Sequence, residues 1–177
     1  DILKTALDAR HPALSSLDEK TAFHATIWGA FNFEPINKQF YRELVNSFIT
    51  LRDHLVAQNR ISATESVSFS IRMIGRLLFV KFLEKKGLIN SGVGYFNPPD
   101  GNSETQTTYY REKLESLFYK TLNTDILERS FPDMVTPYLN GGLFDASASD
   151  FYNKDLVTFP DKYFSSFQST LGKYNFT

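Results

Sequence analysis

Apolar side chains recur every three or four residues along much of the chain, which is the spacing of one face of an α-helix. This spacing predicts a helix from Asn37 to about Gln58 and a second from about Ala63 to Lys86. The first carries one apolar row: Ile36, Phe40, Leu44, Phe48, Leu51 and Leu55. The second carries a wider row: Val67, Ile71, Met73, Ile74, Leu77, Leu78, Val80 and Phe82. The wider row predicts that the second helix is the more central one.

Both ends of the second predicted helix carry recognisable signals. Ser62 and Glu65 have the spacing of a capping box, in which the hydroxyl and the carboxylate each accept a backbone N–H at the helix start. At the other end, Gly87 follows Lys85 and Lys86. Glycine suits the left-handed position that ends many helices, and cations are favoured in the last turn.

The residue pattern of the rest of the chain predicts shorter helices and long loops. Helical spacing returns in residues 110–122 and again from Pro160 to Gly172. Residues 1–34 hold short helical patterns and form a candidate N-terminal extension, while the glycines and prolines of residues 88–107 indicate a long loop. Strand signals are weak and allow at most a small hairpin near residues 138–144. The predicted fold is mainly α: one domain, residues 1–177, built as an irregular helical bundle with long loops.

Composition narrows the class of protein. Of the 177 residues, 42% are hydrophobic and 15% aromatic, which is too much apolar material for a disordered chain. The formal charge is −1, so any nucleic-acid surface must be local. There is no cysteine, which excludes disulfides and thiolate metal sites. No apolar run reaches the roughly 20 residues that a membrane span needs.

The ends of the chain also bear on its origin. It opens on Asp1 without a starting methionine or signal-peptide pattern, and it ends on Thr177 without a charged tail. We expect both ends to be cuts within a longer polypeptide, and we expect that polypeptide to be cytoplasmic.

Two strings resemble catalytic motifs but lack the context that such motifs need. Asn97-Pro98-Pro99-Asp100 resembles the Asn-Pro-Pro-aromatic motif of amino-methyltransferases, yet an aspartate replaces the aromatic residue and no strand precedes it. Glu84-Lys85-Lys86 matches the Glu-x-Lys of metal-dependent nucleases, but no Pro-Asp precedes it and it closes a helix. The sequence therefore predicts no catalytic, cofactor-binding or metal-binding residue in this chain.

A local excess of basic residues lies on the second predicted helix. The row is opposed there by Glu84 alone, and its members are candidates for DNA contact: Arg72, Arg76, Lys81, Lys85 and Lys86. Such a row could neutralise phosphates. The alternative, which we favour, is the solvated border of a core helix, because long cationic side chains commonly flank apolar stripes.

Four segments, in order, resemble a known family. They are Phe31–Glu34 with Phe40–Glu43, the string IRMIGRLLFVKFLEKKG from Ile71 to Gly87, the string YLNGGLF from Tyr138 to Phe144, and the final Lys173–Thr177. Over residues 31–177 the chain resembles the region ahead of the methyltransferase domain in type IIG restriction-modification enzymes and related single-chain DNA adenine methyltransferases.

The resemblance implies a role and a set of partners. The parent enzyme would use S-adenosylmethionine, and Mg²⁺ if it also carries a nuclease. The family's cofactor and catalytic motifs lie beyond Thr177, so the resemblance assigns no cofactor to this chain. It implies a non-catalytic connector that positions nuclease and methyltransferase parts on DNA. Its partners would be DNA and the adjacent methyltransferase domain, with no membrane.

The resemblance also draws attention to the turn at Tyr138, Asn140, Gly141 and Gly142. The two glycines permit positive φ and a close backbone approach, and Asn140 can cap the turn through its side chain. We favour a structural corner over a ligand site. Two other functions stay open: a stand-alone nucleic-acid-binding module that uses the basic helix, and an enzyme whose site the motifs do not reveal.

Overall fold

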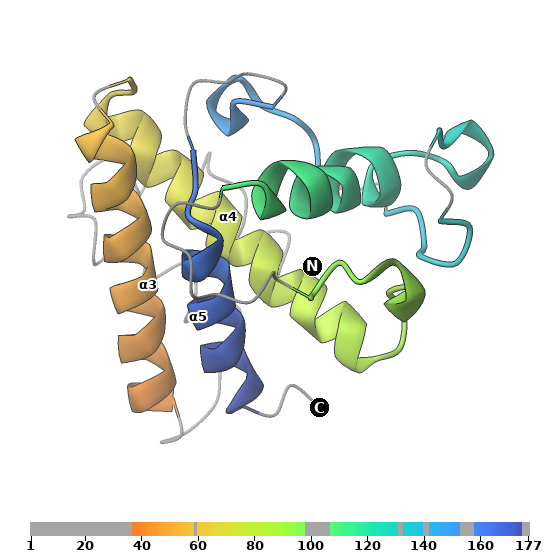
Figure 1. Cartoon of the computed structure of the whole chain (residues 1–177), viewed down its shortest axis with the longest axis horizontal. Helices are drawn as coiled ribbons and strands as arrows, with labels where there is room; N and C mark the ends of the chain where they lie inside the picture. The colour runs from red at the N-terminus through yellow and green to blue at the C-terminus, as the bar shows by residue number, and fades with distance from the viewer. Residues whose placement is uncertain are drawn as a thin grey trace. The chain divides into compact units, whose positions relative to one another are not determined.

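The computed structural model describes residues 37–58, 60–97, 107–130, 133–139, 142–152 and 158–174. These residues form helices and loops, and none of them lies in a β-strand. The mainly α fold predicted from the sequence is therefore confirmed (Figure 1). The candidate extension at residues 1–34 lies outside the described residues, as do Asn140, Gly141 and most of the predicted 88–107 loop beyond Asn97.

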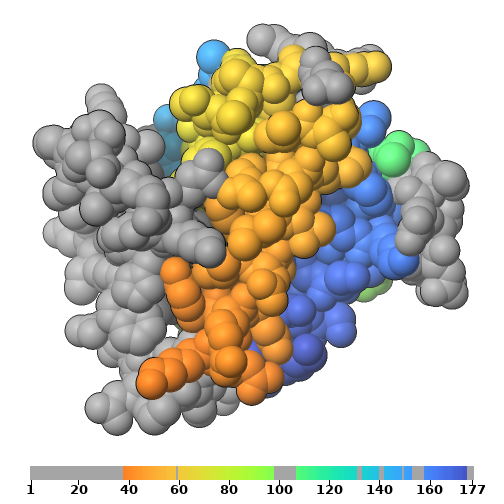
Figure 2. Space-filling view, turned by 90° about the vertical axis from the view of Figure 1, so that its left-hand side faces the viewer, coloured from red at the N-terminus to blue at the C-terminus, as the bar shows by residue number. Residues whose placement is uncertain are grey.

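The chain divides into two compact units, Asp1–Gly75 and Arg76–Thr177. The described part of the first unit holds helix α3, Asn37–Ala57, and the start of helix α4, Ala63–Lys85. As predicted, α3 buries Leu44, Phe48, Leu51 and Leu55. Figure 2 faces α3, drawn in orange. Exposed polar side chains alternate with the buried row along this helix: Lys38, Gln39, Arg42, Asn46, Thr50 and Asp53.

Helix α4 begins and ends as its sequence predicts. The Glu65 carboxylate accepts the backbone N–H of Ser62 at 2.8 Å, and the Ser62 hydroxyl accepts the N–H of Glu65 at 3.2 Å. At the other end, Gly87 has φ +70°. The N–H of Leu88 reaches the Leu83 carbonyl and that of Gly87 the Glu84 carbonyl, both at 2.9 Å. This pair of bonds is the Schellman arrangement, which satisfies carbonyls that the helix end would leave open.

The apolar row of α4 differs from the prediction near both ends: Val67 and Ile71 are half-buried, whereas Phe69, outside the predicted row, is buried. Phe82 is 39% exposed, whereas its neighbour Leu83 is buried. The spacing from Leu78 admits either residue, because three to four residues separate successive positions on one helix face. The ammonium of Lys86 lies 5.6 Å from the centre of the exposed Phe82 ring, over its face. This cation–π contact partly shields the exposed Phe82 ring from solvent.

The second unit contains a wide helix and a terminal α-helix. The predicted helix at 110–122 is present, but its turns are of the π type: η3, Tyr110–Leu114, and η4, Ser116–Leu122. In keeping with the wider turn, the Thr121 hydroxyl donates to the Ser116 carbonyl five residues back. Helix α5, Asp161–Gly172, follows Pro160 as expected. Short 3₁₀ turns occupy the loops: η2, Ser91–Val93; η5, Ile126–Glu128; η6, Ala148–Asp150.

The core of the second unit is aromatic. The Tyr110 ring lies 4.6 Å from that of Phe159, and the Tyr109 ring lies 5.4 Å from that of Phe164 on α5. Phe144, from the predicted turn motif, packs at 5.7 Å from Phe118. Contacts of this kind add to the burial of large apolar area. They tie α5 and the 142–152 loop to the π-helix.

The positive φ of Gly87 gives the first prediction. Substitution Gly87→Ala should lower the free energy of unfolding by about 1 kcal/mol, because a Cβ disfavours the left-handed region even though nothing lies within 4 Å of it. Gly172→Ala is the matched control: it also has open space but lies within α5 and lacks positive φ, so it should be neutral or stabilising. Urea unfolding of both variants measures this, and equal effects would contradict it.

Candidate functional site

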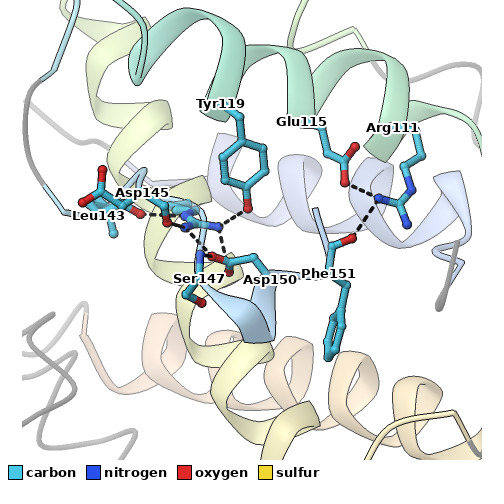
Figure 3. A network of polar contacts seen from close by, with 9 residues as sticks. Arg111, Glu115, Tyr119, Leu143, Asp145, Ser147, Asp150 and Phe151 are labelled. Atoms are coloured by element: carbon cyan, nitrogen blue, oxygen red, sulfur yellow. Dashed lines mark hydrogen bonds and ion pairs between the residues drawn. The ribbon is translucent and has the colours of Figure 1, made fainter. Parts of the chain in front are cut away.

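A single guanidinium, that of Arg76 on α4, organises the polar interior of the second unit (Figure 3). Its side chain is 1% exposed, and all of its N–H donors are engaged. Nε donates to the Leu143 carbonyl at 2.7 Å, and Nη2 donates to the Asp145 carbonyl at 3.1 Å. The remaining bonds go to Tyr119 and Asp150. We call these five residues the Arg76 centre.

Asp150 supplies the charge that balances Arg76. Its two carboxylate oxygens accept from Nη1 at 3.0 Å and Nη2 at 3.1 Å, the two-pronged geometry that suits arginine. The Asp150 side chain is also 1% exposed. One of its oxygens accepts the Ser147 N–H at 2.7 Å, so the same carboxylate completes a capping box on η6. Phe151 then follows with φ +55°, which turns the chain out of η6.

Tyr119 closes the centre from the π-helix. Its hydroxyl oxygen accepts from Arg76 Nη1 at 2.7 Å, and its ring lies 5.2 Å from the guanidinium carbon. Burial raises the pKa of the Tyr119 hydroxyl to about 12, so the group stays protonated at neutral pH. The centre thus offers neither a free base nor a free cation: its donors and its carboxylate are already paired with each other.

The Arg76 centre joins two features that the sequence treats separately. Arg76 belongs to the predicted basic row, whereas Leu143 belongs to the string Tyr138–Phe144. The hydrogen bond from Nε to the Leu143 carbonyl anchors the end of that string, and the buried Phe144 ring follows it into the core. Tyr138 is 37% exposed and Gly142 is exposed, with no positive φ at Gly142. Because Asn140 and Gly141 lie outside the described residues, the structural corner stays a prediction.

The structure corrects the predicted basic row at Arg76. We predicted it as a candidate for DNA contact, but it is buried and bound to Asp150, because the carboxylate and the carbonyls of the 142–150 loop replace its water. Lys81 is 14% exposed and pairs with Glu84. Lys85 and Lys86 are exposed at the end of α4. Arg72 is half-buried and belongs to the first unit. DNA contact by these four stays a prediction.

A second buried carboxylate, which sequence reasoning missed, organises the 133–136 turn. Asp133 Oδ1 accepts the backbone N–H groups of Val135 and Thr136, both at 3.0 Å. Oδ2 accepts the Thr136 hydroxyl at 2.6 Å and the Tyr95 hydroxyl at 3.0 Å. Asn90 adds a bond to Oδ1 at 3.2 Å. Burial alone would raise the pKa of Asp133, but these hydrogen bonds to its charged form lower it to about 2.

Local signals for both carboxylates do exist in the sequence. Ser147 and Asp150 have the three-residue spacing of a capping box, and Asp133 is placed to accept the N–H groups that follow it in a turn. Neither signal indicates the distant partners, which are Arg76 for Asp150 and Asn90 and Tyr95 for Asp133. Among the described residues, no three histidine, aspartate or glutamate side chains are grouped to hold a metal ion. In the same part of the chain, no helix combines the length and apolar character that a membrane crossing requires.

The pairing of Arg76 with Asp150 gives the second prediction. Arg76→Met should lower the free energy of unfolding by about 3–5 kcal/mol, because it leaves a buried carboxylate without its cation. Lys85→Met, on the same helix but exposed, is the matched control and should change stability little. Combining Arg76→Met with Asp150→Leu should cost less than the sum of the single changes, as measured in a double-mutant cycle. Additive costs would show that the two side chains are not coupled.

The low pKa of Asp133 gives the third prediction. A folded-state pKa of about 2 lies below the ordinary value of 3.8, so this carboxylate stabilises the fold above about pH 4 and loses its contribution as the pH falls towards 2. Asp133→Asn should therefore destabilise the protein at pH 7, and its deficit should shrink over that acid range. Glu128→Gln, at an exposed position in the same loop, should show no such convergence in urea unfolding followed from pH 7 to 2.

Comparison with known proteins finds a match to a much longer relative. The chain is 36% identical over 92 residues to a protein of Methanocaldococcus jannaschii named "Putative type II restriction enzyme and methyltransferase". The match covers 47% of this chain and 8% of that protein. No protein-family model matches the chain, and no solved structure matches it. The chain is thus similar to a small part of a protein named for restriction and modification.

Proposed function

We propose that the chain is a non-catalytic helical connector of a DNA restriction-modification enzyme. The similarity to the M. jannaschii protein carries this proposal, since that protein is named as both restriction enzyme and methyltransferase and the match covers 8% of it. The resemblance of Ile71–Gly87 and Tyr138–Phe144 to the region ahead of a methyltransferase domain supports the finer assignment.

The contacts of the Arg76 centre are consistent with a mechanical role. A catalytic or ligand-binding arginine keeps donors for its substrate, whereas the donors of Arg76 are all bound within the protein. The centre fixes α4, the π-helix and the 142–150 loop to one another, which is what a spacer between two working domains needs. In the complete enzyme, S-adenosylmethionine would supply the methyl group and Mg²⁺ would serve a nuclease, both bound outside this chain.

Activity of the separated parts is the fourth prediction and tests the proposal. The 177-residue chain should neither methylate nor cleave duplex DNA when S-adenosylmethionine and Mg²⁺ are added. The complete natural reading frame should transfer a labelled methyl group from S-adenosylmethionine to DNA adenine. Turnover by the 177-residue chain that persists through repeated purification would overturn the non-catalytic assignment. Absence of any DNA methylation or cleavage by the complete polypeptide would overturn the restriction-modification assignment.

A nucleic-acid-binding module is the second candidate function, and the exposure of Lys85 and Lys86 favours it. Both ammonium groups lie at the end of α4, where Arg76 no longer contributes and Lys81 is paired with Glu84. Phosphate neutralisation by such lysines would give binding that weakens steeply with salt. A DNA-binding titration of the 177-residue chain at several salt concentrations tests this candidate. Salt-sensitive binding that is abolished by the double substitution Lys85→Glu with Lys86→Glu would favour it over a connector that does not itself touch DNA.

A further inference from the structure

The loop between η4 and the 142–152 segment presents bare apolar side chains to solvent. Leu127, Met134 and Val135 are 90%, 58% and 68% exposed. We call these three residues the apolar tip. Figure 1 shows their segment, in teal and cyan, extending beyond the end of the π-helix within the second unit.

The loop that carries the apolar tip is held firmly by buried polar groups. Asp133 binds the backbone on which Met134 and Val135 lie, through the N–H groups of Val135 and Thr136. Arg129 closes the loop: Nη1 donates to the carbonyls of Asp133 and Thr136 at 2.7 Å, and Nε donates to that of Thr124 at 3.1 Å. Met134 and Val135 therefore stand on backbone that Asp133 and Arg129 hold in place.

Single exposed apolar residues are ordinary on a protein surface and need no explanation. The tip differs because two adjacent apolar residues stand on a turn whose backbone is bound by the buried Asp133 carboxylate. Such a turn cannot rotate Met134 or Val135 inward without breaking the bonds to Asp133. Methionine and rigidly presented apolar anchors are common at the centres of protein interfaces.

The charges around the tip select the kind of partner. Within residues 120–130 and 133–139, the exposed charged side chains are Lys120, Asp125 and Glu128, and the two carboxylates flank Leu127 in sequence. Arg129 is turned to backbone carbonyls. These two carboxylates disfavour DNA phosphates at the tip, and they would face their own like charges if the tip met a second copy of the chain. A protein surface with an apolar socket and a basic border fits it.

We propose that the apolar tip docks onto another domain of the restriction-modification polypeptide, one that offers such a socket. The inference rests on the proposed function. The size of the M. jannaschii relative supports a domain of the same polypeptide as the occupant, since 92% of that protein lies outside the matched part (100% minus the 8% that is covered). A connector also requires at least one surface through which it holds a neighbouring domain.

Site-specific cross-linking is the fifth prediction. In the complete natural reading frame, Val135 is replaced by the photoreactive p-benzoylphenylalanine, and cross-linked peptides are mapped by mass spectrometry after irradiation. The matched control carries the probe at Ser169, an exposed position on α5. We expect a cross-link from position 135 to a peptide outside residues 1–177 of the same polypeptide, and its loss when the probe is at 169. Mixing isotope-labelled and unlabelled protein identifies cross-links between copies.

Three outcomes would overturn the docking proposal: cross-links from position 135 only to residues 1–177, cross-links only to a second copy, or no cross-link above that of position 169. A substitution test complements the probe. Met134→Asp with Val135→Asp should leave the unfolding midpoint of the 177-residue chain nearly unchanged, since both side chains are exposed, and should lower that of the complete polypeptide. An equal effect on both proteins would count against docking.

The two proposals fail separately. If the complete polypeptide methylates DNA but position 135 gives no cross-link outside residues 1–177, the docking surface is wrong and the connector assignment stands. If position 135 cross-links to another domain but the polypeptide neither methylates nor cleaves DNA, the surface is right and the restriction-modification assignment is wrong.

Discussion

The burial of Arg76 is the constraint on which the second unit depends. A guanidinium cannot leave water unless its charge and its donors are matched, because an unpaired buried charge costs several kcal/mol. One carboxylate, one hydroxyl and two carbonyls provide that match, and they come from segments up to 74 residues away in the chain. Each of those segments is therefore placed by the same side chain, and the position of the 142–150 loop follows from the position of α4.

The Asp133 turn shows the same principle with the charge reversed. Here a buried carboxylate accepts hydrogen bonds from backbone N–H groups, hydroxyls and an amide, which belong to Asn90, Tyr95, Val135 and Thr136. Loops have no ladder of backbone hydrogen bonds to hold them, so a buried ion that collects several donors substitutes for one. The second unit thus uses two charged side chains to fix two irregular segments, and the helices supply the apolar surroundings that strengthen both.

What the sequence predicted well was local. Apolar spacing and end signals identified α3, α4 and α5, since the Ser62–Glu65 capping box and Gly87 act within a few residues of themselves. The π-type turns of η3 and η4 were missed because Tyr110, Leu114, Leu117 and Leu122 fit an α-helical row equally well. Arg76 was misplaced on an exposed row for a deeper reason. In the sequence, a cation beside an apolar stripe has the same pattern whether its side chain reaches water or a buried carboxylate. No residue near Arg76 in the sequence indicates that Asp150 is its partner.

The contrast between the two buried charged groups and the exposed apolar tip bears on the proposed connector role. A spacer transmits position only if its own segments cannot slide, and saturated ion centres resist sliding because any shift exposes an unpaired group to a low-dielectric interior. A docking surface has the opposite requirement, because groups that are already fully bonded within the protein gain no new contacts from a partner. The second unit meets both requirements: the charged groups of Arg76 and Asp133 are buried and paired, and the apolar side chains of Met134 and Val135 are exposed. Rigidity and adhesiveness are then assigned to different residues: substitution of Met134 or Val135 leaves the polar anchors in place, whereas loss of Asp133 would also release the backbone that carries the tip.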